Sequence, residues 1–285
     1  MESADRGLDI EHPDDAVGGE DGTQSILYPV FEDHDAYTFE IARDVAEGAD
    51  AGLIVLDLVE DEESLTDEAH TVGKQLLRSK LDEHHDVSVS SLIETTSDPP
   101  ETVAKIAQAY DVHLIVFDRH TPDALVDSLR GDVAERISDR VHCDAVSVDH
   151  AGDDRLSSIL VPIADGPHSP LAVSVAGALG KGADAAVELF HVSTGGDTDR
   201  VDELFERALA RLPDDVDADT WHLERADVAD AIVEQSEYYD VTAIGEPQKN
   251  RLKRFVLGSV TDDISDRADN TVLVCRRSDG QKFDI

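Results

Sequence analysis

The sequence predicts an α/β protein built from two tandem copies of one domain, each an open parallel five-stranded sheet with helices on both faces. Three observations predict this class: an internal repeat, a regular alternation of strand-like and helix-like segments, and a composition typical of folded domains with an acidic surface. A chain of 285 residues is long enough for two domains that each bury a core.

Three short segments of the first half return in the second half, in the same order and at nearly constant spacing. Ser25-Ile-Leu-Tyr-Pro-Val30 returns as Ser158-Ile-Leu-Val-Pro-Ile163. Gly48-Ala-Asp-Ala51 returns as Gly182-Ala-Asp-Ala185, and Ile137-Ser-Asp-Arg140 as Ile264-Ser-Asp-Arg267. The repeat predicts an acidic disordered tail at 1–24, a first domain at 25–148, a polar linker at 149–156, a second domain at 157–277 and a tail at 278–285.

Short apolar runs alternate with longer amphipathic stretches in both copies, which favours parallel sheets covered on both faces. We expect strands at 25–31, 51–59, 86–94, 112–117 and 145–148, and again at 158–163, 185–192, 216–223, 240–244 and 271–275. We expect helices at 36–48, 67–83, 100–110 and 131–141, and again at 169–181, 199–211, 227–238 and 259–268.

The charge balance is strongly acidic, with 64 Asp and Glu against 24 Lys and Arg and a formal net charge of -40. At molar ionic strength the Debye length falls to ~3 Å and screens the resulting repulsion, so we interpret the chain as a protein of a halophilic cytoplasm. Hydrophobic residues make up 40% of the chain and recur between the carboxylates, as in folded domains. DNA and RNA are excluded as partners because the surface lacks cations to neutralise phosphates.

No segment is long and apolar enough to predict a membrane span, because the longest run without a charged residue covers only 166–180. The first 24 residues hold eight carboxylates and no apolar stretch, so we expect no signal peptide. Cys143 and Cys275 are expected to be buried free thiols near the last strand of each half. No group of histidines has the spacing of a zinc site, so we expect no metal centre.

The loop after the fourth strand of the second copy is the strongest candidate for chemistry, because ligands of open α/β sheets bind beyond the carboxyl ends of the strands. Gly258 and Ser259 open a helix whose N–H groups can hold an anion, and four cations lie just before them: Lys249, Arg251, Lys253 and Arg254. A phosphate chain is the predicted ligand. The same residues also fit a glycine–serine helix cap beside a charge-balanced surface.

These residues resemble the universal stress protein family in its tandem two-domain, haloarchaeal form. The family's nucleotide-binding loop has a glycine, two residues, a glycine, nine residues, and then Gly-Ser or Gly-Thr. Here Ile244-Gly245 is followed by Gln248 at the second glycine position and by Gly258-Ser259-Val260-Thr261. The resemblance runs from about Ser25 to Arg276, and implies an adenine nucleotide alpha hydrolase-like, Rossmann-like fold.

The resemblance implies that the second domain binds ATP or AMP, with Mg possible beside ATP and slow hydrolysis at most. Adenine and ribose would lie at Pro162, Ile163, Ala164 and Val192. Binding members commonly have aspartate at the position of Ala164, and Asp165 is one place later. The implied binding residues are Pro162, Ile163, Ala164, Asp165, Val192, Ile244, Gly245, Gln248, Lys253, Arg254, Gly258, Ser259, Val260 and Thr261.

In the first copy the equivalent loop positions are Asp118, Thr121, Gly131 and Asp132. The carboxylates of Asp118 and Asp132 would repel phosphate, so the nucleotide site of this copy is expected to be degenerate. Two functions stay open: a cytoplasmic stress-response regulator that binds an adenine nucleotide, and a nucleotide-free interaction module that regulates a partner such as a membrane transporter. The resemblance also implies a pseudo-dimer inside the chain, with 145–148 beside 271–275, and a possible homo-oligomer.

Overall fold

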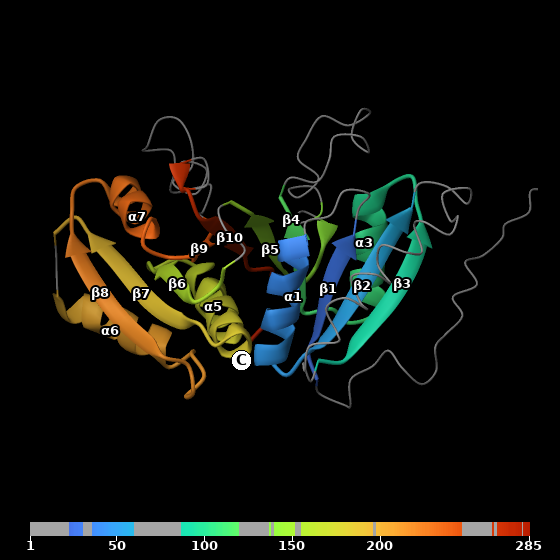
Figure 1. Ribbon diagram of the computed structural model, residues 1–285, viewed down its shortest axis with the longest axis horizontal. Coiled ribbons are helices and arrows are strands. Elements are labelled where there is room, and N and C mark those ends of the chain that lie inside the picture. Colours follow the sequence, from blue (N-terminus) through green and yellow to red (C-terminus); the bar gives the residue numbers. More distant parts are fainter. Residues whose placement is uncertain are drawn as a thin grey trace, which may run out of the picture.

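The computed structural model describes residues 23–30, 36–59, 87–119, 137, 140–151, 155–195, 198–246, 264, 267–280 and 282–285 (Figure 1). The first half contains β1 (Ser25–Val30), α1 (Ala36–Gly48), β2 (Gly52–Val59), β3 (Val89–Thr95), α3 (Pro99–Ala109), β4 (Leu114–Asp118) and β5 (Asp144–Asp149). The second half contains β6 (Ser158–Pro162), α5 (Ser169–Ala183), β7 (Ala186–Ser193), α6 (Thr198–Leu209), β8 (Ala218–Glu224), α7 (Val228–Ser236), β9 (Val241–Gly245) and β10 (Thr271–Arg276).

The predicted alternation of strands and helices is confirmed wherever the chain is described, with ends that differ by a few residues. The strand predicted at 216–223 is β8, and the helix predicted at 227–238 is the shorter α7. The helix predicted at 67–83, and most of those predicted at 131–141 and 259–268, lie outside the described residues.

The strands form one ten-stranded sheet in the order β3-β2-β1-β4-β5-β10-β9-β6-β7-β8. Within each half every pairing is parallel, and the inner strands are buried and read as apolar runs such as Gly52–Val59, whereas the edge strand β8 is mostly exposed. The order reverses between β1 and β4 in the first half and between β6 and β9 in the second. These are the two places where an open α/β sheet binds ligands.

The two halves meet through an antiparallel pairing of their last strands, in which Val148 lies opposite Leu273 and Val146 opposite Cys275. This pairing confirms the expected contact of 145–148 with 271–275. It also joins two five-stranded sheets, which the sequence suggested as separate sheets, into a single continuous one. Cys143 and Cys275 are buried and free, as expected.

Helices α1 and α5 cross side by side over this joint, as Figure 1 shows at the centre of the molecule. Two glycines at matching repeat positions make the close approach possible. A Cβ added at Gly48 would lie 1.9 Å from the carbonyl oxygen of Ala178, and one added at Gly182 would lie 2.0 Å from that of Asp44. The contact is therefore repeated about a pseudo-twofold axis that relates the two halves.

The two faces of the sheet are organised differently. One face is covered by α1, α5 and α6 and carries a single hydrophobic core that includes Val45, Leu179 and Phe205 from these helices. The other face has two separate cores, one beneath α3 and one beneath α7. Helix α5 is apolar on all sides, because it packs on the sheet and on α1 at once.

The segment that follows β10 crosses onto the first half and is anchored there. The buried carboxylate of Asp144 accepts the N–H groups of Ser278 at 2.7 Å and Phe283 at 3.0 Å, and the Phe283 side chain is fully buried. The Arg277 guanidinium lies 3.3 Å from the same carboxylate. This segment therefore ties the second half to the start of β5.

Candidate functional site

The candidate site lies where β6 and β9 run side by side and their connections leave in opposite directions. Ile159 pairs with Val241 and Leu160 with Thr242, so the strand ends at Pro162 and Gly245 come to the same edge of the sheet. A crevice at this edge is the expected ligand position for this topology. The described part of the predicted site gathers here.

The structure divides the predicted residues between the two faces of the sheet. Val192 and Ile244 pack into the core beneath α7, and Pro162 lies on the same side because it pairs with Phe190 of that core. Ile163 is buried on the opposite face, with α5 and α6. Ala164 is exposed in the loop that follows β6. Three of the predicted apolar contacts, Pro162, Val192 and Ile244, therefore lie together beneath α7, whereas Ile163 and Ala164 do not join them.

Gly245 allows the end of β9 to touch the first turn of α5. A Cβ at this position would lie 2.7 Å from the carbonyl carbon of His168 and from the nitrogen of Ser169. Ser169 is the first residue of α5, and its hydroxyl accepts the Ala164 N–H at 3.2 Å. The loop after β6, helix α5 and strand β9 are thus fixed to one another.

His168 connects this junction to the segment after β10. Its Nδ1 accepts the N–H of Arg277 at 2.9 Å, which requires the imidazole to be unprotonated at that nitrogen. Burial lowers the pKa of His168 below its ordinary value, with further effects from Glu246, Arg276, Asp144 and Arg277. Neutral histidine is therefore the form that suits the folded protein.

Asp165, which follows the position where binding relatives have an aspartate, faces α6 rather than the crevice. Its carboxylate accepts hydrogen bonds from Arg200, by Nε at 3.0 Å, and from Arg207, by Nη2 at 2.9 Å. Hydrogen bonds from these two arginines lower the pKa of Asp165. The structure therefore gives this carboxylate a role in joining the loop to α6.

Arg200 and Arg207 are not among the residues predicted for the site, although their spacing in the sequence is a signal that could have found them. Arg200, Leu204 and Arg207 recur at helical spacing, so they fall along one side of α6, and Arg211 follows the end of the helix. That side faces the loop and α5, where a groove of about 900 Å³ is lined by Ile163, Ala164, Asp165, Val173 and Leu204, among others. Three residues of the predicted site therefore also line a groove on the α5 and α6 face.

The phosphate part of the predicted site lies outside the described residues. This holds for Gln248, Lys253, Arg254, Gly258, Ser259, Val260 and Thr261. From the helix predicted after them, Ile264 is fully buried and Arg267 pairs with Asp230 at 2.8 Å. In the first copy, Asp118 is half-buried at the end of β4, and Thr121, Gly131 and Asp132 are likewise outside the description.

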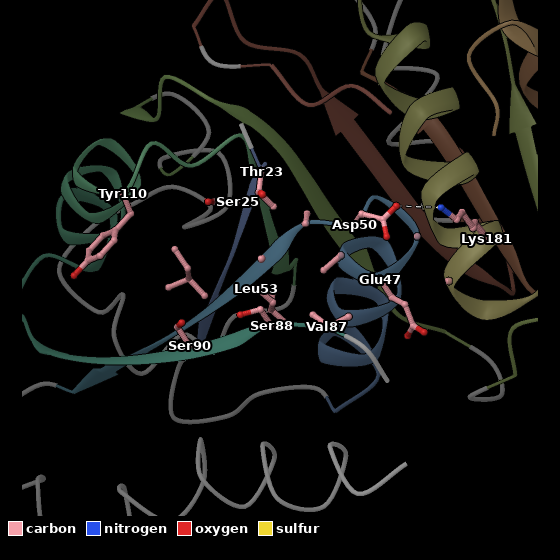
Figure 2. A pocket seen from close by; sticks show the side chains of 16 residues that line it. Thr23, Ser25, Glu47, Asp50, Leu53, Val87, Ser88, Ser90, Tyr110 and Lys181 are labelled. Carbon is pink, nitrogen blue, oxygen red and sulfur yellow. Dashed lines mark hydrogen bonds and ion pairs between the residues drawn. The ribbon is translucent and has the colours of Figure 1, made fainter. Parts of the chain in front are cut away.

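A second hollow, of about 440 Å³, lies at the amino ends of β1, β2 and β3 and is drawn in Figure 2. Glu47 and Asp50 both line it, and the Asp50 carboxylate lies 3.3 Å from the Lys181 ammonium of α5. This edge is opposite to the one that carries ligands in open α/β sheets, so it does not compete with the crevice as the main site. Within the described residues, no cluster of His, Cys, Asp and Glu suits a metal ion.

The strand order and the parallel pairings define a doubly wound α/β protein with two related halves. The model of the Universal stress protein family matches residues 22–149 and 156–276, so the chain belongs to the universal stress protein family. A search of the curated proteins found no match. None of the described helices has the length and apolar character needed to cross a membrane.

Solved structures with this fold cover nearly the whole chain. A universal stress protein from Archaeoglobus fulgidus DSM 4304 is 16% identical with a TM-score of 0.57, over 90% of this chain and 97% of that one. One from Pseudomonas aeruginosa UCBPP-PA14 is 15% identical with a TM-score of 0.58, over 90% and 95%. The cytoplasmic domain of a prokaryotic cation chloride cotransporter is 12% identical with a TM-score of 0.56, over 89% and 95%.

Proposed function

We propose that this universal stress protein is a stress-response regulator that binds an adenine nucleotide, ATP or AMP, in its second half. The observation that supports this most strongly is the junction at the end of β9. There Gly245 lies against the first turn of α5, and Pro162, Val192 and Ile244 present one apolar cluster beside the same edge. A flat base can lie at the edge of this cluster, beside the half-buried Val192, while its phosphates extend along the loop that begins at Gly245.

The charges of that loop suit phosphates. Lys253 and Arg254 precede Gly258 and Ser259, which open the predicted helix, in a chain that is otherwise strongly acidic. Positive side chains and a helix N-terminus both favour an anion, and Mg would accompany ATP. The first half has Asp132 at the place of Ser259, so we propose a single nucleotide per chain.

Calorimetric titration with ATP and AMP in molar potassium chloride tests the proposal. Native protein should bind close to one nucleotide per chain. Ser259→Asp should bind roughly 5-fold to 150-fold more weakly, because a new carboxylate ~4 Å from a phosphate costs about 1 to 3 kcal/mol after screening. Asp132→Ser is the matched control in the first half and should leave binding unchanged. A stoichiometry near two, or full affinity in Ser259→Asp, contradicts the proposal.

A nucleotide-free interaction module is the second candidate, and Asp165 favours it. Relatives that bind nucleotide commonly have a carboxylate at the position of Ala164, whereas the nearby carboxylate of this chain is held by Arg200 and Arg207. One similar structure is the cytoplasmic domain of a cation chloride cotransporter, so a membrane transporter is the partner class to examine. Absence of any nucleotide binding by the native protein would select this second function.

We also propose that the protein works in a salt-rich cytoplasm, because a net charge of -40 repels itself at low ionic strength. Circular dichroism during dialysis from molar potassium chloride into dilute buffer tests this. The melting temperature should fall and the spectrum should lose structure as screening weakens. An unchanged melting temperature in dilute buffer would rule out dependence on salt.

A further inference from the structure

Strand β8 is the outer edge of the ten-stranded sheet in the second half. Among the described strands it pairs only with β7, and Figure 1 shows it at one end of the sheet, away from the joint between the halves. Most of its residues are exposed, and Trp221 keeps 39% of its surface open to solvent. An open edge is a template for pairing with another strand, and proteins often block such edges with lysine or proline. Residues 217–225 contain neither.

The hydrogen bonds to β7 fix which backbone groups of β8 point away from the sheet. The Val187 N–H donates to the Asp217 carbonyl at 2.9 Å, and the Arg225 N–H donates to the Ser193 carbonyl at 2.8 Å. Successive residues of a strand direct their N–H and C=O groups to opposite sides, so the odd-numbered residues between these two bonds also face β7. The even-numbered residues therefore offer their backbone groups to a new strand: Ala218, Thr220, His222 and Glu224.

The odd-numbered side chains of β8 lie on the face of the sheet that α7 covers. Trp221 packs on Phe190 with ring centroids 5.2 Å apart, and Leu223 packs against the same core. Asp219 falls on this face by alternation. Arg225 does so as well, and it bonds a carboxylate of α7 while 44% of its side chain stays exposed. Along the strand, this face thus carries a carboxylate, an aromatic ring, an aliphatic side chain and a guanidinium.

This order is self-complementary when the strand meets a second copy of itself in the antiparallel direction. With His222 opposite its own counterpart, the outward backbone groups of residues 220, 222 and 224 pair and form about six hydrogen bonds. The same register sets Asp219 opposite Arg225 and Trp221 opposite Leu223, each twice. Such opposite charges and apolar pairs stabilise neighbouring strands. The adjacent register, with Trp221 opposite itself, would place the Asp219 carboxylate against Leu223 instead.

From this complementarity we propose that the chain forms a twofold homodimer through β8, with His222 at the axis. An isologous contact of this kind closes both open edges at once. The protein already uses the same device internally, where β5 and β10 pair antiparallel to join its two halves. The contact uses the outer edge of the sheet, whereas the proposed nucleotide lies between β6 and β9, so the two proposals are independent.

Analytical ultracentrifugation of the full chain in molar potassium chloride tests the proposal. The native protein should sediment with twice the mass of one chain in the micromolar range. Thr220→Pro should weaken the dimer roughly 100-fold, because it removes an outward N–H from each strand and adds a ring at the contact. The bonds from β8 to β7 remain, since proline is tolerated where the N–H faces solvent.

Ser91→Pro is the matched control on β3, the opposite edge of the sheet. The Leu53 N–H donates to the Ser88 carbonyl and the Thr96 N–H to the Val59 carbonyl, so Ser91 also directs its N–H outward. This variant should leave the dimer unchanged. A monomeric native protein, a dimer that Thr220→Pro does not weaken, or an equal loss in Ser91→Pro would overturn the proposal.

An exchange of charges tests the register without a change in the backbone. Asp219→Arg sets two guanidinium groups opposite each other at both ends of the contact and should weaken the dimer roughly 10-fold. Adding Arg225→Asp restores opposite charges and should recover most of the affinity. If the second change does not rescue the first, Asp219 and Arg225 do not face each other and the proposed register is wrong.

Cross-linking locates the twofold axis. His222→Cys brings two thiols together across the axis, at a Cα separation of about 5.5 Å that a disulfide can span. Thr220→Cys is the control in the same strand, because its counterpart lies opposite Glu224. The native cysteines are buried, so they do not compete. Under mild oxidation His222→Cys should form covalent dimers at least about 10-fold faster than Thr220→Cys, and equal rates would overturn the proposed axis.

Discussion

At the carboxyl edge of the sheet, the two halves make the same interaction with reversed charges. In the first half, Arg119 Nη1 lies 3.3 Å from Asp149 Oδ2, and at the matching place in the second half Arg276 Nε lies 3.4 Å from Glu246 Oε2. In both halves the N–H of the residue after the fourth strand donates to a carbonyl of the fifth strand, at 2.8 and 2.9 Å. The backbone frame has therefore stayed the same while the charges on it have changed.

The strand ends next to these pairs differ more deeply. The fourth strand ends with Asp118 in the first half and with Gly245 in the second. Only the glycine leaves room for the backbone of α5 to touch the strand, since any Cβ there would overlap His168. The second half therefore keeps a close backbone approach between β9 and α5, while the first half has a charged side chain at the same point.

The largest expected difference lies between the residue that anchors the segment after β10 and the residue that anchors the segment after β5. Removing each anchor should change the free energy of unfolding by a different amount. Asp144 holds the segment after β10, and at the matching position Thr271 donates its hydroxyl to the Ala151 carbonyl at 3.1 Å. Asp144→Ala leaves two N–H groups and Arg277 without their buried partner, so we expect a loss of about 3 to 5 kcal/mol. Thr271→Val removes one neutral hydrogen bond and should cost about 1 kcal/mol.

Urea unfolding in molar potassium chloride measures both changes. Asp144→Asn is the matched variant, because it keeps an acceptor of similar shape and should recover part of the loss. Equal effects of Asp144→Ala and Thr271→Val would show that the two anchors are equivalent and would contradict the predicted asymmetry.

The helix crossing should behave symmetrically. Gly48→Ala and Gly182→Ala each force α1 and α5 apart, and each should destabilise the protein by about 1 to 3 kcal/mol. The double variant should cost less than the sum, because one separation of the helices relieves both overlaps. Gly52→Ala is the control, since the nearest atom to its Cβ would be 4.0 Å away. Additive losses in thermal melts would contradict a shared contact.

Exchanging the reversed ion pairs tests whether the charges or their positions matter. Arg119→Glu places a negative charge beside Asp149 and should cost about 1 kcal/mol. Adding Asp149→Arg should restore most of it, giving the first half the charge order of the second. Urea midpoints of the single and double variants give the coupling energy. Failure of the second change to rescue the first would mean that other contacts of these residues dominate.

The repeat and the alternation of elements were predictable from sequence because both depend on local patterns. Buried parallel strands read as apolar runs, and matching segments such as Gly48-Ala-Asp-Ala51 and Gly182-Ala-Asp-Ala185 fix the order of elements. Burial of the two cysteines followed from the same patterns. The family match over both halves confirms the repeat.

The site was predictable only in part, because side-chain direction depends on contacts between distant elements. The sequence places Asp165 beside Ala164, but only the packing of α6 onto the loop shows that two arginines hold its carboxylate. Likewise, Gly245 reads as a loop glycine, and its role against His168 appears only when β9 meets α5. The docking of the segment after β10 onto Asp144 has no local signal at all.

The smallest expected effect is a pH dependence that arises at His168 in the second half. Burial lowers the pKa of His168, so the folded state resists protonation while the unfolded chain accepts a proton at its ordinary pKa of about 6.5. The contribution of His168 to the free energy of unfolding should be fully present above that pH and should decline as the pH falls below it. The hydrogen bond from the Arg277 N–H to Nδ1 is lost on protonation, which adds to the same trend.

His168→Gln removes the titration and should reduce the decline in the free energy of unfolding between pH 7 and 5 by up to about 1 kcal/mol. His222→Gln, which changes an exposed histidine on β8, is the control, and an identical decline in all three proteins by urea unfolding would show that His168 does not cause it.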